Sequence, residues 1–234
     1  MSALRTSEIY RYLGYRGITQ DPEMDARIAA CTEKLMAAST PRVIHEKFPV
    51  TAAAADTVRI GELEITSHSL YQNLSDCTDA YMFSATVGLG IDRLIRRAEI
   101  SSMTDALIFQ AVGAEMIETY ADTENEKLRQ LEAAAGNILK PRFSPGYGDL
   151  PLALQTDFFR ILPITKRCGI TLTDTLLMVP SKSITAFIGV KPGNGSPVPA
   201  QSGSPSAAVP SDDAPEHSAH NCQSCTLQQC AFRV

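Results

Sequence analysis

The stretch SMTDALIFQAVGAEMIETYADTENEKLRQLEAAAG, residues 102–136, carries the longest helical pattern in the chain. Its first half is apolar on nearly every side, and its second half is rich in charged residues. A helix that is apolar all round is buried, so the first half is expected to lie in the core. Ser101 or Ser102 can begin it, because a serine hydroxyl accepts a hydrogen bond from a free amide of the first turn. The stretch therefore predicts a long central helix around which the rest must pack.

Shorter patterns on both sides alternate between helix and strand. Asp21 and Pro22 form a good N-cap and N1 pair for a first amphipathic helix. Strands are expected at 42–50, 57–67 and 80–88 and on either side of Pro180, and helices at 67–74, 89–99, 151–162 and 163–169. Regular βαβ units and a G-x-G-x-x-G between strand and helix are missing, which argues against a Rossmann fold. We expect an α+β fold, with an antiparallel sheet, a long central helix and flanking helices.

Composition excludes several classes of protein. The 234 residues are 44% hydrophobic and 20% charged, which is enough to bury a core. The net charge of −5 and the lack of clustered basic residues argue against nucleic acid as a partner. No apolar run is long enough for a membrane span, and the N-terminal residues do not resemble a signal peptide. We therefore expect a cytoplasmic protein, without a membrane as partner.

Composition also divides the chain into three parts. Residues 1–190 carry the periodic patterns of a folded domain, whereas residues 191–221 are rich in Pro, Gly, Ser and Ala and are expected to be a disordered linker. Residues 222–234 form a short Cys-rich tail, CQSCTLQQCAFRV. The three other cysteines, Cys31, Cys77 and Cys168, are scattered in apolar surroundings and are expected in the core.

The segment PRFSPGYGDLP, residues 141–151, has the residue types of a small-molecule cradle. Arg142 offers a planar fork of donors for a carboxylate, and Gly146 lets the backbone approach a ligand without a Cβ. Tyr147 adds a ring with a polar tip. Ser144 and Pro145 lie between them, and the prolines stiffen the predicted bend. An ordinary Pro-Gly turn with a surface arginine is the alternative interpretation.

Glu118 is the acidic residue that could complete this site. It follows Leu107 by eleven residues, which places it only about 20° away on the same helical face. A carboxylate among the apolar positions of a central helix is costly unless it is paired. Glu118 therefore either meets a ligand or forms a structural ion pair with Arg142, and the sequence leaves both readings open.

Four segments in this order resemble the activation domain of cobalamin-dependent methionine synthase. They are FSATVGLGIDRLIRRAE (83–99), MTDALIFQAVGAEMIETYAD (103–122), PRFSPGYGDLP (141–151) and GITLTDTLLMVPSKSITAFIGV (169–190). The resemblance covers about residues 7–190 and looks like a stand-alone version of the domain. Its most specific piece is Arg-x-x-x-Gly-Tyr, which in the family binds S-adenosylmethionine. It implies that Arg142 meets the carboxylate of the methionine moiety, that Gly146 and Tyr147 line the cofactor, and that Glu118 lies near its amino group.

The resemblance also implies a function. The protein would present S-adenosylmethionine as methyl donor for the reductive methylation of cob(II)alamin held by a partner chain. That partner would be a cobalamin-binding methionine synthase or a related corrinoid protein, with a flavodoxin or ferredoxin as electron donor. Catalysis would rest on positioning, so no acid-base residue is expected. The alternatives are a corrinoid-protein redox and docking adaptor that acts through its tail without S-adenosylmethionine, and a subunit that only docks.

The tail places Cys222, Cys225 and Cys230 in a C-x2-C-x4-C array, with two histidines just upstream. Three thiolates this close suit a metal. Zinc would take a fourth ligand such as histidine, and an iron–sulfur cluster would take three cysteines with one open or exogenous ligand. A cluster of reactive thiols without metal is the other interpretation.

Overall fold

The computed structural model describes residues 4–15, 21–53 and 56–193. Most of its strands form one six-stranded sheet in the order β3-β2-β1-β4-β8-β5, and every neighbouring pair is antiparallel. These strands are β1 (Arg42–Ala53), β2 (Thr57–Ile60), β3 (Leu63–Thr66), β4 (Asp79–Thr86), β5 (Asn137–Phe143) and β8 (Ser183–Pro192). A separate ribbon joins β6 (Thr171–Leu172) to β7 (Met178–Val179). The predicted α+β class with an antiparallel sheet is confirmed.

The centre of the sheet is buried on both faces. Every residue of β4 from Ala80 to Thr86 is buried, because β1 and β8 pair with its two edges and helices cover its two faces. A strand covered on both faces needs a continuous apolar run instead of alternation, and that is the pattern of residues 80–88. The predicted buried strand is therefore confirmed.

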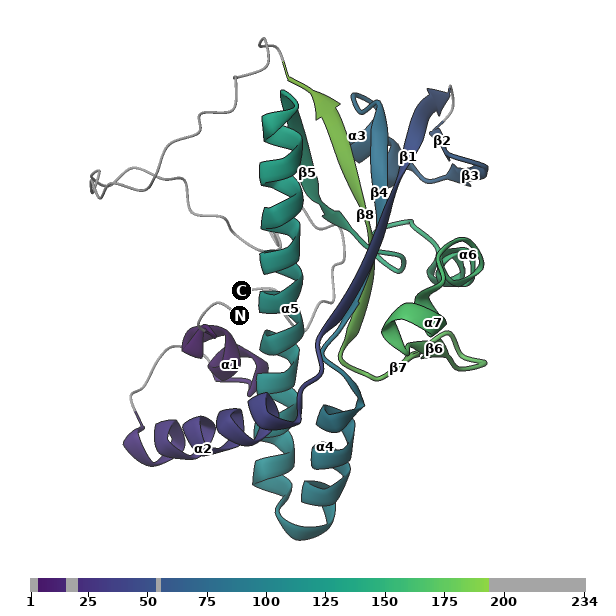
Figure 1. Ribbon diagram of the computed structural model, residues 1–234. Coiled ribbons are helices and arrows are strands. Elements are labelled where there is room, and N and C mark those ends of the chain that lie inside the picture. The colour runs from purple at the N-terminus through teal and green to yellow at the C-terminus, as the bar shows by residue number, and fades with distance from the viewer. Residues whose placement is uncertain (1–3, 16–20, 54–55, 194–234) are drawn as a thin grey trace, which may run out of the picture.

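The helix α5 (Met103–Ala134) lies along one face of the sheet (Figure 1). The side chain of Ser102 accepts a hydrogen bond from the amide of Asp105, so the predicted N-terminal cap is present. The other helices of this layer, α1 (Thr6–Tyr12), α2 (Pro22–Ala38) and α4 (Leu89–Ser101), pack against α5. Their apolar side chains form one core cluster with the α5 face of β4 and β8. The central helix is thus the spine of this layer.

The opposite face of the sheet carries shorter helices. They are α3 (His68–Leu74), the 3-10 turn η1 (Leu152–Leu154), α6 (Gln155–Ile161) and α7 (Ile164–Cys168). A second core cluster joins them to the sheet, and within it the rings of Phe158 and Phe187 lie 4.7 Å apart. The two clusters on opposite faces give the domain three layers, with the sheet in the middle (Figure 1).

The glycines of the sequence GLG, residues 88–90, serve helix packing. A Cβ on Gly88 would lie 2.1 Å from the Oγ1 of Thr40, and a Cβ on Gly90 would lie 2.1 Å from the carbonyl oxygen of Ala38. Both contacts are with the chain that leaves α2, so the two glycines allow α4 to begin directly against the end of α2. This packing role agrees with the non-Rossmann prediction.

Several elements differ from the expectations. The sequence patterns did not reveal α1, and β5 occupies part of the segment that was expected to be a stiff bend. The helix expected at 151–162 is divided into η1 and α6. Cys31, Cys77 and Cys168 are buried, as predicted. Within the described residues no helix is long and apolar enough to cross a membrane. Of the linker expected at 191–221, Lys191 and Pro192 belong to β8. Residues 194–221 and the cysteine tail lie outside the described residues.

Candidate functional site

Arg142 lies on β5, the edge strand next to β8, and not in the bend that the sequence suggested. The ladder between β5 and β8 has a bulge, because Leu139 pairs with Val190 while Arg142 pairs with Ile188. Two residues of β5, Lys140 and Pro141, thus oppose one residue of β8, Gly189. In a regular strand a spacing of three would put Leu139 and Arg142 on opposite faces of the sheet. The extra residue in the bulge brings both side chains back to the same face. The bulge therefore aims both side chains at α5.

The guanidinium of Arg142 meets two carboxylates of α5. Its Nη2 lies 3.0 Å from an oxygen of Glu118, and its Nη1 lies 2.8 Å from an oxygen of Asp122. The two acids are four residues apart and share one face of the helix. The side chain of Arg142 is only 14% exposed, whereas that of Asp122 is 51% exposed. Each arm of the arginine fork thus has its own acidic partner, and the Asp122 arm is the one open to solvent.

A second arginine continues this charged cluster toward the N-terminus. The Nε of Arg5 lies 2.8 Å from Glu115, whose side chain is fully buried, and the backbone amide of Arg5 also donates to it. The hydroxyl of Thr119 donates to the same carboxylate. Arg5 also lies 3.9 Å from Asp122. The hydrogen bond to Glu115 raises the pKa of Arg5. The N-cap of α1 is therefore tied to the same helical face that holds Arg142.

After β5 the chain turns through Ser144, Pro145, Gly146 and Tyr147. Pro145 is buried, while Gly146 adopts a φ of +91° that favours glycine. The amide of Gly146 donates to the carbonyl of Leu150, and the amide of Tyr147 donates to the carbonyl of Ser144. These bonds close a compact turn. Gly146 is exposed, and the side chain of Tyr147 is largely exposed, so the turn presents bare backbone beside an aromatic ring.

The far end of this loop is fixed to α3 by Asp149. Its carboxylate accepts hydrogen bonds from the hydroxyl of Ser67 at 2.6 Å and from the amides of His68 and Ser69 at 2.7 and 3.1 Å. These donors hold the pKa of Asp149 far below its usual range. Gly148 packs against the same helix, since a Cβ there would lie 2.8 Å from the Oγ of Ser69. With β5 at one end and α3 at the other, the loop is held at both ends.

The structure brings the predicted site residues together. Glu118 and Arg142 are in direct contact, and the turn at residues 144–147 follows Arg142 immediately. The ion pair that the sequence left open is therefore present. One expectation was wrong: Glu118 is only partly buried, and it is Glu115, one turn earlier on α5, that is fully buried in this cluster.

Sequence reasoning missed Arg5, Glu115 and Asp122. The signal for the acids was the i, i+3, i+7 spacing of Glu115, Glu118 and Asp122, which lines carboxylates along one stripe of a helix. No comparable local signal existed for Arg5, because its partner Glu115 lies 110 positions away.

The three tail cysteines, Cys222, Cys225 and Cys230, lie outside the described residues. Within the described part of the chain, no group of three or more potential metal ligands comes together. The described thiols behave as core residues. Burial raises the pKa of Cys77 to about 11, and burial likewise raises the pKa values of Cys31 and Cys168.

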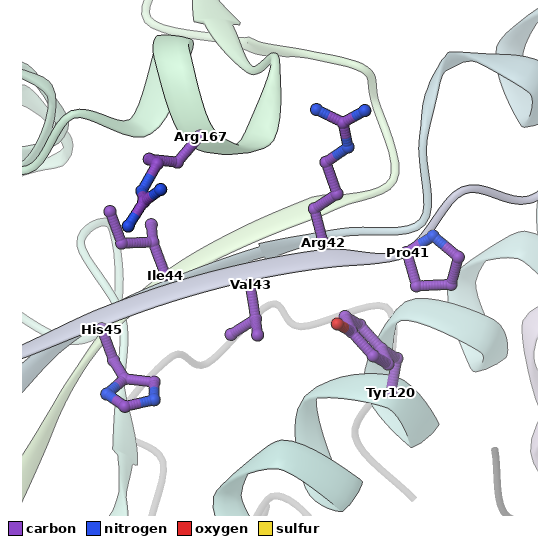
Figure 2. A pocket seen from close by; sticks show the side chains of 7 residues that line it. All are labelled: Pro41, Arg42, Val43, Ile44, His45, Tyr120 and Arg167. Atoms are coloured by element: carbon purple, nitrogen blue, oxygen red, sulfur yellow. The ribbon is translucent and has the colours of Figure 1, made fainter.

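A cavity of about 480 Å³ lies beside the first residues of β1, and none of the predicted site residues line it. Pro41 and residues 42–45 of β1 line it, together with Tyr120 of α5 and Arg167 of α7 (Figure 2). It is separate from the Arg142 cluster, because β4 and β8 lie between β1 and β5.

Comparison with known proteins agrees with this fold. A crystal structure of the MetH reactivation domain bound to AdoHcy is similar with a TM-score of 0.62, at 14% sequence identity, over 82% of this chain and 75% of that chain. No curated protein sequence matches the chain. The family model described as "Vitamin B12 dependent methionine synthase, activation domain" matches residues 72–194, which is more than half of the chain and includes α5, β5 and the Arg142 turn. The chain therefore belongs to the family of vitamin B12-dependent methionine synthase activation domains.

Proposed function

We propose that the protein binds S-adenosylmethionine and presents it to a cobalamin held by a partner chain, as the methyl donor for reductive methylation of cob(II)alamin. The observation that carries the proposal is the placement of Arg142. The bulge in β5 aims its guanidinium at two acids of α5, directly before a turn of exposed backbone. An amino-acid ligand needs a cation and a carboxylate side by side, and this cluster offers both.

The residues present fit the amino-acid end of that cofactor. The Nη1 of Arg142 contacts the half-exposed Asp122, so a ligand can approach it from solvent. A ligand carboxylate can therefore take the place of Asp122 there. Glu118 is less exposed and keeps the other arm, where it can also accept a hydrogen bond from the ligand ammonium. Both interactions would be charge-assisted, which makes them stronger than neutral hydrogen bonds.

The turn at residues 144–147 would hold the rest of the cofactor. Gly146 is exposed and has no side chain, so a ligand can approach its backbone closely. Tyr147 projects an aromatic ring beside it, and the buried Pro145 keeps the turn in place. Because the loop is held by β5 and by Asp149, little conformational entropy would be lost when a ligand binds.

The cofactor would supply an electrophilic methyl group on its sulfonium. The residues assigned here bind and orient, and none of them needs to move a proton. The partner would be a cobalamin-binding methionine synthase or a related corrinoid protein, and a flavodoxin or ferredoxin would supply the electron. We place this reaction in the cytoplasm.

Calorimetric titration with S-adenosylmethionine tests the proposal on the full chain and on the variant Arg142→Ala. Loss of charge-assisted bonds worth about 1.5–3 kcal/mol would weaken binding by roughly 10- to 150-fold. Arg160→Ala is the matched control, because Arg160 also pairs with an acid, Asp157, at 2.9 Å but on α6. Absence of binding to the wild-type protein would overturn the proposal and leave the adaptor function. Equal binding by Arg142→Ala would overturn the assignment of Arg142 to the site.

For the rest of the chain we propose the division stated above, with the end of the activation domain moved from residue 190 to Pro192, where β8 ends. A linker up to residue 221 and a metal-binding tail at 222–234 would follow. Cys222, Cys225 and Cys230 would hold zinc or an iron–sulfur cluster, and a cluster could deliver the electron. Metal analysis and visible absorption of anaerobically purified protein separate these options. The triple serine variant should lose the metal and keep S-adenosylmethionine binding. Equal metal content in both proteins would remove the tail site.

A further inference from the structure

The strand β1 has an open edge over the residues that line the cavity. Its residues 42–49 pair with β4 on one side, and β2 pairs only from Val50 onward. The amide of Val50 donates to the carbonyl of Thr78, just before β4. Because backbone groups alternate in direction along a strand, the amides and carbonyls of Ile44 and Glu46 also point toward β4. Val43 and His45 therefore point their amides and carbonyls outward. From the described residues, no backbone hydrogen bond reaches that side of residues 43–47.

Two arginines flank this edge. Arg42 and Ile44 project from the face of β1 that α7 covers, and Arg167 projects from α7 toward them (Figure 2). Neither arginine has an ion-pair partner among the described residues, unlike Arg5 and Arg142 at the other site. The cavity thus combines two unpaired cations with an unused row of backbone donors and acceptors.

This combination favours an extended acidic peptide over a small anion. A free anion can accept hydrogen bonds from the amides of Val43 and His45, but it would be repelled by their carbonyl oxygens. An added strand satisfies both kinds of group, as in other cases of strand addition to a sheet edge. A second copy of this chain is disfavoured, because pairing the two edges would bring the Arg42–Arg167 pairs of both copies together.

The chain itself contains a segment of this kind. Among residues 194–234, the acids are Asp212, Asp213 and Glu216, all within the sequence SDDAPE at 211–216. In an extended strand Asp212 and Glu216 share one face, and Asp213 and Pro215 lie on the other. With the two acids on the Arg42 face, a strand parallel to β1 turns the nitrogen of Pro215 away from β1, whereas an antiparallel strand would point it at β1, so the added strand must be parallel. Proline is tolerated in this outward position of an edge strand. The alternation of the segment therefore matches what the edge requires.

The segment is also close enough to reach the edge. Gly193 follows the end of β8, and the strand registers place it about 30 Å from the outer side of Ile44. Residues 194–211 separate it from Asp212. A coil of that length spans about 24 Å on average, and an extended chain spans up to about 60 Å. An attached segment has a high effective concentration at such a distance.

We propose that residues 211–216 add a strand to the open edge of β1, with Asp212 and Glu216 paired to Arg42 and Arg167. The sheet would then gain a seventh strand on the side opposite the Arg142 site, and its open edge would be covered. The same contact would fix where the chain that leads to the cysteine tail leaves the domain.

Amide hydrogen exchange measured by NMR on the full chain tests this proposal. In the wild-type protein the amides of Val43 and His45 should exchange slowly. In the variant Asp212→Asn/Asp213→Asn/Glu216→Gln they should exchange at least about tenfold faster, as expected from the loss of two or three exposed ion pairs. The amides of Ile44 and Glu46 should stay slow in both proteins and serve as the folding control.

A second variant, Arg42→Gln/Arg167→Gln, should release the same two amides without a change in the acidic segment. Fast exchange of Val43 and His45 in the wild-type protein would overturn the proposal. Slow exchange that persists in the acidic-segment variant would also overturn it: dependence on protein concentration would assign the edge to a second copy, and protection that needs added inorganic phosphate would assign it to a free anion.

Discussion

Replacing Asp122 with asparagine should tighten the binding of S-adenosylmethionine, whereas replacing Glu118 with glutamine should weaken it. Both acids contact the guanidinium of Arg142 from the same face of α5. They differ in exposure, since the side chain of Asp122 is 51% exposed and that of Glu118 is 24% exposed. In the proposed site Asp122 competes with the ligand carboxylate, and Glu118 binds the ligand ammonium. Two similar substitutions one helical turn apart should thus act in opposite directions.

The sizes of the two effects follow from the exposure of each pair. An exposed ion pair such as Arg142–Asp122 contributes about 0.5–1 kcal/mol, so its removal would tighten binding about two- to fivefold. Glu118→Gln would lose a charge-assisted contact worth about 1.5–2 kcal/mol, which corresponds to binding weaker by roughly 10- to 30-fold. The two variants should therefore differ in affinity by more than an order of magnitude.

Isothermal titration calorimetry on both variants measures this difference directly. Asp157→Asn is a matched control, because it changes the net charge equally and breaks another ion pair, at 2.9 Å from Arg160 on α6. Its affinity should equal that of the wild-type protein. Urea denaturation of each variant shows whether the fold is kept. Weaker binding by a stably folded Asp122→Asn would refute the competition argument and would make Asp122 a direct ligand contact.

Two further predictions concern stability. Gly90→Ala would place a methyl group 2.1 Å from the carbonyl oxygen of Ala38, so α4 and α2 must separate, and urea denaturation should show a loss of about 2–4 kcal/mol; an unchanged midpoint would show that this contact relaxes freely. The hydrogen bonds from Lys140 and Lys191 lower the pKa of Asp76 to about 2. This contribution is present above the ordinary carboxyl pKa and is lost as pH falls from about 4 to about 2, so Asp76→Asn should lose less stability than the wild-type protein across that window. Equal pH profiles in thermal denaturation would contradict it.

The elements predicted correctly have signals that are local in the sequence. Asp21 caps α2 through the amides of Glu23 and Met24, as its position before Pro22 indicates. Ser102 caps α5, and the continuous apolar run at 80–88 becomes the central strand β4. In each case the residues that decide the structure lie within a few positions of each other in the sequence. Neither the partner strands nor the tertiary packing therefore had to be known.

The strand β5 shows where local signals fail. Pro141 and the Pro-Gly pair that follows favour a bend. Leu139 and Arg142 are three residues apart, a spacing that would put them on opposite faces of a regular strand. The bulge resolves both conflicts, since it absorbs one residue and leaves Pro141 at the edge of the sheet. The presence of a bulge depends on the pairing with β8, which begins more than forty residues later.

The wrong prediction that Glu118 is buried has a related cause. The prediction placed Glu118 on the helical face that carries Leu107 and took that face as apolar and buried, but Leu107 is 57% exposed and the buried positions include Ile108, Val112 and Glu115. Periodicity gives the angle between two side chains, but which face meets the sheet is set by the fold. Glu115 tolerates full burial because Arg5, from the other end of the domain sequence, covers it.

The balance of charge in the cluster connects these errors to the proposed function. Glu115, Glu118 and Asp122 carry three negative charges, and Arg5 and Arg142 carry two positive charges, so the described cluster has a net charge of about −1 at neutral pH. S-adenosylmethionine carries an ammonium, a sulfonium and a carboxylate, and its net charge is +1. A site built only from Glu118 and Arg142, as the sequence suggested, would be neutral and would match the two ends of any amino acid equally. The additional acid is Asp122, and the excess charge attracts a cationic amino acid toward the site over a long range, where salt screens it. The competition of Asp122 for Arg142 is a direct contact and is the larger of the two effects at physiological salt.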